Sequence, residues 1–579
     1  MRDYDVIVVG GGINGLTTAA YLARAGLSVA VFEARGQCGA NCDTVELGLP
    51  GFLHNTHACW LVPSISPAMA DLDLEGHGLD LRGTSVLFAK PFLDGRNVLQ
   101  ALDGAQTQAS LERISPRDAR VREIISTHAV EEAGESLAVG RASQYGPPTP
   151  AVRRRVMEQH ARLLAKLDLP ITAEDLHRMT GLEVLDLLYE SEEARTIVAG
   201  LGEYTGQWPT HRGTGPNVLG QAGLGLTPIH TARGGSHALT HALVKAFVAA
   251  GGDVWTTCPV ERIVVEGGRA VGVRLSPDAL FPGEEVRARV VVSNLTFTPT
   301  FLGLLGEEVI GPDWAARASR FSYDEPQLLG VYYALSGDVE FASAAHDPGI
   351  QRCWVGYLGG ETLDRMRAAF SALATGVIPD EPGVGWFLPT RADPTQAPPG
   401  CHTAFLWTGV PPCPRRWRGR RLDGWDSWPE VAEPLADAVT EQTERYAPGF
   451  SDLVIERHVL TPADMEANNP TAVRANMCGG SPIPEQMGEN RPLPGVIREG
   501  VSRTFVPGLY LSNSIHPYGA THLACGYLAA DEVARDLGCR DVDWWCSEPF
   551  DWYITNLGRI PLDLGVGERW RAEPAGVAS

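Results

Sequence analysis

Long apolar runs are missing from this sequence. The apolar stretch near the N-terminus, Val6-Ile7-Val8-Val9, is too short to cross a membrane, runs into glycines and is preceded by no basic segment. It therefore has the pattern of neither a membrane span nor a secretory signal. We expect a soluble, cytoplasmic protein with at most peripheral membrane contact.

Basic residues are scarce relative to acidic ones. Lys and Arg number 48 against 70 Asp and Glu, which gives a formal net charge of −22 at pH 7. A nucleic-acid-binding protein needs a basic face, so no nucleic-acid partner is expected, and this charge does not favour binding to anionic lipid. With 44% hydrophobic and 20% charged residues over 579 positions, the chain has an ordinary globular composition and is long enough for more than one domain.

Paired cysteine motifs are also lacking. The 11 cysteines are odd in number and scattered, without a C-x-x-C pair. The spacing of Cys38 and Cys42 suits neither a zinc ribbon nor a thioredoxin motif, so buried thiols are the expected state, with a redox disulfide between these two as the alternative. No metal site is expected, and no hydrolase signature is present.

What the sequence does contain, in its first 35 residues, is the pattern of a nucleotide-binding unit. The apolar run is followed by Gly10-Gly11-Gly12-Ile13-Asn14-Gly15, and residues 17–25 then have the pattern of a helix that ends at Gly26. In the G-x-G-x-x-G spacing, Gly10 permits the turn, Gly12 lets a pyrophosphate approach the backbone, and Gly15 lets helix and strand pack closely. Phosphates would bind at the helix N-terminus, where backbone N–H groups are free and the dipole is positive.

A carboxylate follows at the distance that this unit requires. A second apolar run, residues 29–32, ends at Glu33, 18 residues beyond Gly15, where the unit binds ribose hydroxyls. A glycine pattern alone also occurs in turns of other α/β proteins. Strand, helix, second strand and acidic residue together indicate dinucleotide binding.

A second block of α/β pattern lies in the middle of the chain. Gly234-Gly235-Ser236 precedes a predicted helix that ends near Gly251-Gly252. Other patterns predict a loop at 51–60, a helical region at 115–193, and strands at 254–256, 260–265, 270–275, 286–292, 330–335 and 402–408.

These segments resemble the phytoene desaturase and carotenoid ketolase family of FAD-dependent oxidoreductases. The resemblance rests on the N-terminal glycine unit with Arg35 and Gly39 after Glu33, on Val291-Val292-Ser293-Asn294, and on Arg491-Pro492-Leu493-Pro494-Gly495. One glycine of a family pair is replaced, because Gly39 is followed by Ala40. The resemblance implies an α/β fold: a Rossmann-like FAD-binding domain, with a doubly wound sheet and a β-meander, interleaved with a mixed α+β substrate domain.

The resemblance also implies FAD as the cofactor, bound noncovalently. Val260 is placed at the adenine by its position in the family's strand, and Asn513 is the polar side chain best placed to replace a backbone contact. The residues expected to bind FAD are Gly10, Gly12, Asn14, Gly15, Glu33, Arg35, Asn41, Val260, Asn513 and Thr521.

The catalytic candidates lie around a predicted helix at about 521–537, whose N-terminus faces the flavin in this family. They are His516, Tyr518 and His522. A histidine is a base of near-neutral pKa, and Tyr518 stands where the family has a small residue, so it would line the substrate pocket and orient a substrate carbonyl. His54 and His57 are placed near the flavin by the same resemblance, with a hydrogen-bonded structural role as the simpler interpretation.

The predicted domain limits place two interleaved domains before a C-terminal tail. Residues 1–85, 226–296 and 495–540 form the predicted FAD-binding domain, residues 86–225 and 297–494 the substrate or cap domain, and residues 541–579 the tail. The tail is rich in aromatic residues, which favours a packed cover or a subunit contact: Trp544, Trp545, Phe550, Trp552 and Tyr553.

The expected function is that of a dehydrogenase or desaturase. It would take a hydride from a C–H bond of a small apolar substrate, such as a terpenoid, carotenoid or cyclic ketone, to flavin N5. A redox-neutral flavin isomerase and a ketolase need the same cofactor site and remain alternatives. GDP dissociation inhibitors, from another class, share the architecture and bind prenylated proteins without redox chemistry, but the intact glycines and Glu33 favour an enzyme. The bulky Tyr518 favours a compact substrate, and a homo-oligomer is compatible with the sequence.

Overall fold

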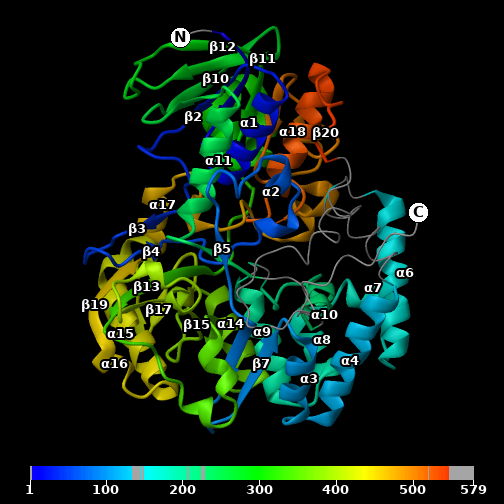
Figure 1. Ribbon diagram of the computed structural model, residues 1–579. Helices are drawn as coiled ribbons and strands as arrows, with labels where there is room; N and C mark the ends of the chain where they lie inside the picture. The colour runs from blue at the N-terminus through cyan, green and yellow to red at the C-terminus, as the bar shows by residue number, and fades with distance from the viewer. Residues whose placement is uncertain are drawn as a thin grey trace.

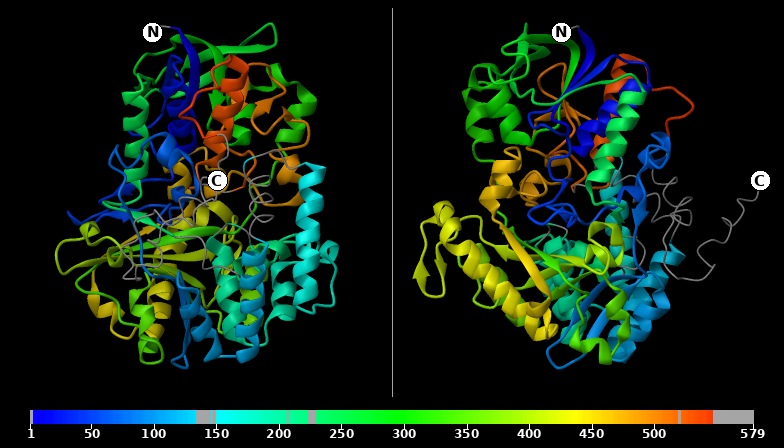
Figure 2. Two further views of the ribbon diagram at one scale, coloured as in Figure 1. Left: turned by 45° about the vertical axis from the view of Figure 1, so that its right-hand side comes forward. Right: turned by 60° about the vertical axis from the view of Figure 1, so that its left-hand side comes forward.

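The computed structural model describes residues 3–132, 145, 149–204, 206, 208–222, 229–518 and 521–546. The chain forms two stacked regions (Figures 1 and 2). The upper region contains the first strand and the last helix, and the lower region contains a second sheet with helices beside it.

A nine-stranded sheet forms the upper region, in the order β20-β21-β22-β12-β1-β2-β9, with β10 and β11 continuing antiparallel from β12. The strands β22, β12, β1, β2 and β9 run parallel to one another. The bounds are β1 (Tyr4–Val9), β2 (Val29–Phe32), β9 (Asp253–Trp255), β10 (Val260–Glu266), β11 (Arg269–Leu275), β12 (Glu285–Ser293), β20 (Ile497–Glu499), β21 (Arg503–Thr504) and β22 (Leu509–Leu511).

Both faces of this sheet are covered, which explains why β1 reads as a continuous apolar run. Val6 and Val8 pack against the helices α1 (Ile13–Arg24), α11 (His237–Ala249) and α18 (Ala524–Leu537). Ile7 and Val9 point the other way, toward the meander of β10 and β11. The predicted fold class, a Rossmann-like unit with a β-meander, is confirmed.

The last helix begins later than its predicted start at residue 521. Leu523 has a left-handed backbone conformation (φ 59°), and the His522 ring nitrogen Nδ1 accepts a hydrogen bond from the Ala524 N–H at 3.1 Å. The histidine therefore caps the first turn, and the helix starts at Ala524.

A seven-stranded sheet forms the lower region, in the order β19-β13-β16-β15-β14-β6-β7. Its strands are β6 (Val86–Pro91), β7 (Asn97–Ala101), β13 (Gln327–Leu335), β14 (Val355–Leu358), β15 (Val384–Phe387), β16 (His402–Val410) and β19 (Val454–Leu460). The sheet is mixed, because β14 pairs parallel with β6 while the other pairs are antiparallel.

Helices of the predicted helical region pack beside this second sheet, on the right in Figure 1. They share one apolar core with β6 and β14. The helices of the lower region are α3 (Gly104–Glu112), α4 (Pro116–Glu131), α6 (Pro150–Lys166), α7 (Ala173–Leu176), α8 (Gly181–Leu188), α9 (Glu192–Tyr204), α10 (Gly215–Ala222), α14 (Leu363–Ala374), α15 (Trp428–Tyr446) and α16 (Phe450–Leu453). The predicted domain limits remain predictions.

The described part of the C-terminal tail packs on its own chain. The rings of Trp544 and Trp545 lie 5.9 and 4.7 Å from the Tyr21 ring of α1. Arg540 lies over the Trp545 ring at 4.5 Å. This segment is a cover for α1, whereas Phe550, Trp552 and Tyr553 lie outside the described residues.

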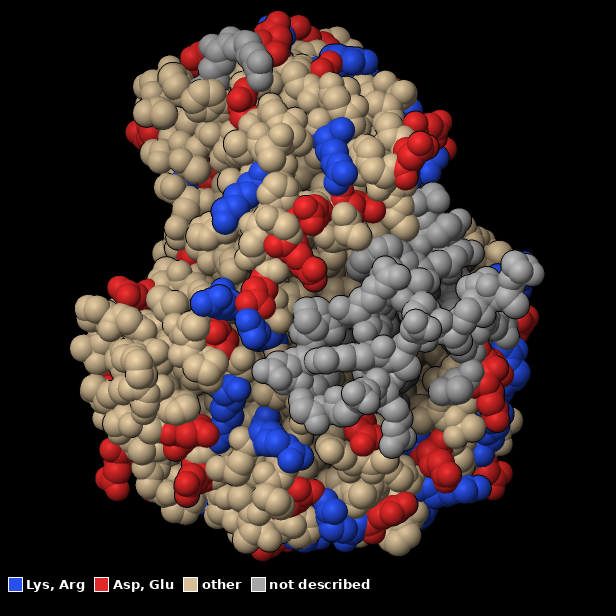
Figure 3. Space-filling view, in the orientation of Figure 1, with Lys and Arg blue, Asp and Glu red and all other residues tan. Residues whose placement is uncertain are grey.

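All 11 cysteines are free thiols, so the disulfide between Cys38 and Cys42 is not formed. Burial raises the pKa of both thiols to about 12. In the part of the chain that the structure describes, no helix is long and apolar enough to cross a membrane, and no three His, Cys, Asp or Glu side chains are grouped to hold a metal ion. Acidic and basic side chains are interspersed over the coloured part of the face in Figure 3.

Candidate functional site

The turn between β1 and α1 leaves no room for side chains. A Cβ on Gly12 would lie 2.6 Å from the Asn294 amide nitrogen, and one on Gly15 would lie 2.4 Å from the Gly10 carbonyl oxygen. Gly10 has φ 93°, a conformation that glycine adopts without strain. No side chain caps α1 in the described structure, so the backbone N–H groups of its first turn remain available to a phosphate.

Glu33 directly follows β2 and binds the backbone of this turn through its carboxylate. Its carboxylate accepts hydrogen bonds from the backbone N–H groups of Gly11 at 2.7 Å and Arg35 at 2.8 Å. The Arg35 guanidinium bonds to the buried Asp43 carboxylate at 2.8 Å. The backbone N–H of Cys258 donates to the Glu33 carbonyl at 2.8 Å, which brings the start of β10, and with it Val260, toward the same edge.

A polar cavity of about 100 Å³, the nucleotide cavity, opens at the N-terminus of α1. Of the predicted FAD-binding residues, Gly12, Asn14, Asn41, Asn513 and Thr521 line it, whereas Gly10, Gly15, Glu33, Arg35 and Val260 do not. Amide side chains dominate its polar lining, which includes Asn14, Asn41, Asn294, Asn469, Asn476 and Asn513.

Asn294, which was not among the predicted site residues, lies against the glycine turn and lines the nucleotide cavity. It directly follows β12, and its backbone N–H donates to the Val9 carbonyl at 2.8 Å, so its side chain lies beside Gly12. The Ser512 hydroxyl donates to its side-chain oxygen at 3.1 Å. The available signal was an asparagine at the carboxyl end of a buried parallel strand, where α/β sheets bind ligands.

A second cavity, the apolar cavity, has a volume of about 310 Å³. The elements α9, β13, β15 and β16 of the lower region contribute part of its wall. The wall is rich in aromatic and sulfur-containing side chains: Cys59, Trp60, Tyr204, Phe387, Trp407, Met465, Met477 and Cys478. It shares five lining residues with the nucleotide cavity, a set that we call the junction: Asn41, Ala58, Met477, Cys478 and Thr521.

Of the catalytic candidates, Tyr518 and His522 line the apolar cavity, and His516 lines neither cavity. The Tyr518 hydroxyl donates to the Gly206 carbonyl at 2.8 Å, so its proton is engaged within the protein. The His522 Nδ1 accepts the Ala524 N–H, and Nε2 lies 3.4 Å from the Tyr518 carbonyl oxygen. Burial lowers the pKa of His522 to about 4, so its ring is neutral at pH 7.

The other titratable groups in this wall are also uncharged at pH 7. Burial lowers the pKa of His57 to about 4 and raises that of Cys478 to about 11. Burial also raises the pKa of Cys59 and Tyr204 well above the usual range. His54 is buried outside both linings, with its ring 5.9 Å from that of Tyr332. Among the residues that the structure describes, the wall of the apolar cavity therefore offers a substrate no charged group.

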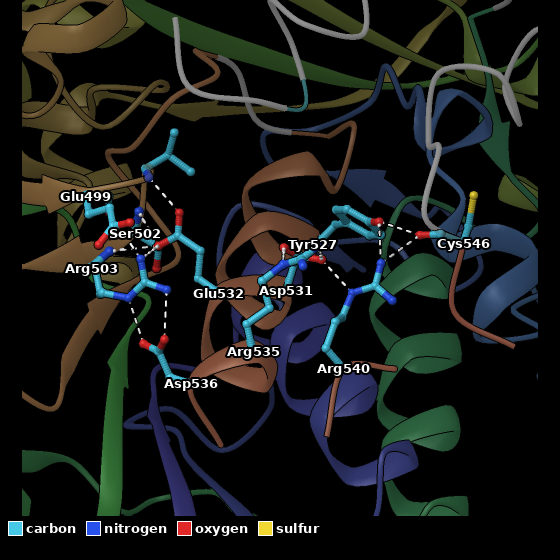
Figure 4. Close-up of polar contacts among 11 residues, drawn as sticks. Glu499, Ser502, Arg503, Tyr527, Asp531, Glu532, Arg535, Asp536, Arg540 and Cys546 are labelled. Carbon is cyan, nitrogen blue, oxygen red and sulfur yellow. Dashed lines mark hydrogen bonds and ion pairs between the residues drawn. The ribbon is translucent and has the colours of Figure 1, made fainter. Parts of the chain in front are cut away.

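The helix α18, which follows the junction residue Thr521, is held on two sides (Figure 4). The buried Glu532 carboxylate accepts the backbone N–H groups of Val501, Ser502 and Arg503 at 2.6, 3.1 and 3.0 Å. On the other side, Arg540 donates to Asp531 at 2.5 Å. These bonds hold the C-terminal half of α18 in place.

Sequence comparison agrees with this geometry. The family of NAD(P)-binding Rossmann-like domains matches residues 8–72. A mouse protein, pyridine nucleotide-disulfide oxidoreductase domain-containing protein 2, is 30% identical over 92% of this chain and 94% of its own length. The chain belongs to this family of FAD-dependent oxidoreductases, which is of the phytoene desaturase-like type.

Two more relatives and one solved structure extend the comparison. A limonene dehydrogenase subunit of Castellaniella defragrans is 28% identical, over 95% of this chain and 97% of its own. The lycopene-forming phytoene desaturase of Pseudescherichia vulneris is 24% identical, over 79% and 85%. The structure of cyclohexylamine oxidase from Brevibacterium oxydans has a TM-score of 0.55 at 16% identity and covers 93% of this chain and 100% of its own, which shows a shared fold. The predicted family and the prediction of an oxidoreductase are confirmed, and the comparisons indicate a flavin or nucleotide cofactor.

Proposed function

We propose that the protein is an FAD-dependent dehydrogenase that takes a hydride from a C–H bond of a compact, uncharged, apolar substrate. The observation that carries this proposal is the apolar cavity of about 310 Å³, which has a neutral wall and meets the nucleotide cavity at the junction.

The residues present fit FAD. Glycine is required at positions 12 and 15, because a Cβ there would lie 2.6 and 2.4 Å from neighbouring atoms. The first turn of α1 carries no acidic side chain that would compete with a phosphate. This arrangement suits a pyrophosphate. The six asparagines of the nucleotide cavity supply neutral donors and acceptors for hydroxyl groups, and Glu33 is positioned for a ribose.

The bound flavin would supply the hydride acceptor, and the protein would supply binding, orientation and a dry cavity. The aromatic wall, with Trp60 and Trp407, would hold an apolar ring in van der Waals contact and exclude water. His57 and His522 are neutral, so they do not supply a charge that would pair with a carboxylate substrate, and an ammonium substrate gains no ion pair from them either.

Cavity size supports a compact substrate over a long polyene. Ligand cavities run from about 300 to 1,000 Å³, so this one is at the small end of the range. The relative that acts on limonene, by its name, is similar over nearly the full chain. A monocyclic terpene or a cyclic ketone is the substrate class that we propose.

The test is anaerobic reduction of the bound flavin. The purified protein should carry FAD that is released by acid. A panel of monocyclic terpenes and cyclic ketones should contain a compound that bleaches the flavin, whereas cyclohexylamine should not. Bleaching by the amine alone would contradict a neutral substrate. Turnover of a terpene without bleaching would instead indicate the redox-neutral isomerase, and a colourless protein would remove FAD from the proposal.

A further inference from the structure

A buried cation, Arg491, lies directly behind the junction. Its side chain is 4% exposed, and its guanidinium donates to the carbonyls of Cys478 at 2.5 Å, Ile515 at 3.0 Å and Gln486 at 3.2 Å. Cys478 lines both cavities, and Ile515 lies between the lining residues Asn513 and Tyr518. Arg491 therefore joins two separate loops of the site through one planar group.

The charge of Arg491 is not neutralised nearby. An arginine stays protonated in proteins, and among the described residues no carboxylate is one of the groups that act most strongly on the pKa of this guanidinium. The Arg491 charge acts on the pKa of Glu325, but this carboxyl group is only 4% exposed. Burial raises the pKa of Glu325 to about 8, so at pH 7 it is uncharged.

The remaining titratable groups around the guanidinium are also neutral. The Tyr518 ring lies over it at 5.0 Å, and Tyr323, Cys478 and Cys525 are the other neighbours that it influences. Burial raises the pKa of Tyr323, Cys478 and Cys525 above their ordinary values. One positive charge therefore remains in a desolvated place beside the site, where electrostatic interactions are stronger than in water.

We infer that Arg491 is a positioning residue that raises the reduction potential of the bound cofactor, an inference that rests on the proposed function. Two electrons and one proton, delivered together as a hydride, add one negative charge to the cofactor. A nearby buried cation stabilises this form more than the oxidised one, and the guanidinium fork also holds the two loops in place.

Two substitutions separate charge from geometry. Arg491→Met keeps a long side chain without charge, and Arg491→Lys keeps the charge without the fork. The midpoint potential of each flavin-loaded protein is measured against a reference dye with an enzymatic reductant, so no substrate is needed. Arg491→Met should weaken the binding of reduced cofactor, relative to that of oxidised cofactor, about tenfold. For a two-electron couple this change lowers the midpoint potential by about 30 mV. Arg491→Lys should keep the potential and bind FAD more weakly.

An unchanged potential in Arg491→Met overturns the inference. If Arg491→Met does not bind flavin, the potentials of the wild type and Glu325→Gln are compared instead, because the amide of this variant cannot ionise. Above pH 8 the wild-type carboxylate forms and offsets Arg491, so the wild-type potential at pH 9 should fall about 30 mV below that of Glu325→Gln, with no difference at pH 6. Coincident potentials at pH 9 overturn the inference, and a wild-type protein without flavin overturns the proposed function together with it.

Discussion

Replacing the buried Glu203 with glutamine should stabilise the protein, and the gain should depend on pH. Glu203 lies in the last turn of α9, one residue before the cavity residue Tyr204, and is 6% exposed. It hydrogen-bonds with the Tyr357 hydroxyl, and no basic group offsets its desolvation. Burial raises its pKa from 4.5 to about 8.

The magnitude follows from proton linkage. The pKa of Glu203 is higher in the folded protein than in the unfolded chain. Its contribution to the free energy of unfolding is therefore largest below pH 4.5 and is lost as the pH rises to about 8. Each pKa unit corresponds to about 1.4 kcal/mol, so at pH 7 the wild type should lose about 3 kcal/mol by taking up a proton on folding. Glutamine has the same shape, accepts the tyrosine bond and takes up no proton.

Thermal unfolding at constant cofactor loading measures this difference. For a chain of this length the unfolding entropy is about 1.2 kcal/mol per kelvin, so Glu203→Gln should raise Tm by about 3 °C at pH 7 and by less than about 1 °C at pH 5. Glu441, exposed on α15, gives the matched control, and Glu441→Gln should leave Tm nearly unchanged at both pH values. A Tm difference between Glu203→Gln and wild type that is the same at pH 5 and pH 7, or a less stable variant, would refute the reasoning.

Two other substitutions test the site directly. Gly12→Ala places a Cβ 2.6 Å from Asn294 and should weaken FAD binding about 5- to 150-fold, because overpacking costs about 1 to 3 kcal/mol, whereas Gly36→Ala, with nothing within 4 Å, should keep full flavin occupancy after gel filtration. Equal occupancy of the two variants would contradict the predicted cofactor site. Tyr518→Phe removes the bond to the Gly206 carbonyl and should lower the unfolding free energy by about 1 kcal/mol while flavin reduction, followed by stopped flow, changes by less than about threefold. A loss of a hundredfold would instead make Tyr518 a catalytic residue.

The parts of the fold predicted from the sequence are those encoded by neighbouring residues. β1, the glycine turn, α1 and Glu33 lie within about thirty residues, and their spacing reflects contacts inside one βαβ unit. The meander strands were predicted for the same reason, since short alternating runs and a Gly267-Gly268 turn specify them. The start of α18 was placed too early because the capping contact of His522 depends on a loop conformation that no residue pattern indicates.

The lining of the site could be predicted only in part, because it is assembled from distant segments. Asn469 and Asn476 reach the nucleotide cavity from the far end of the chain, and the Asn469 amide donates to the Asn41 side chain at 2.8 Å across 428 positions. Phe387 and Trp407 meet Tyr204 through pairing of β15 and β16, with no periodic signal of a cavity. Residues of this kind look like ordinary core or loop positions until the topology is known.

The distribution of charge gives the buried Arg491 its significance. The formal charge of −22 produces a negative potential that disfavours a further negative charge on a bound cofactor, although salt screens exposed charges within about 10 Å. The apolar cavity adds nothing to offset it, since its histidines are neutral. A cation that is 4% exposed is screened far less than the surface. Arg491 can therefore favour hydride uptake at physiological ionic strength, while the wall that contacts the substrate stays uncharged.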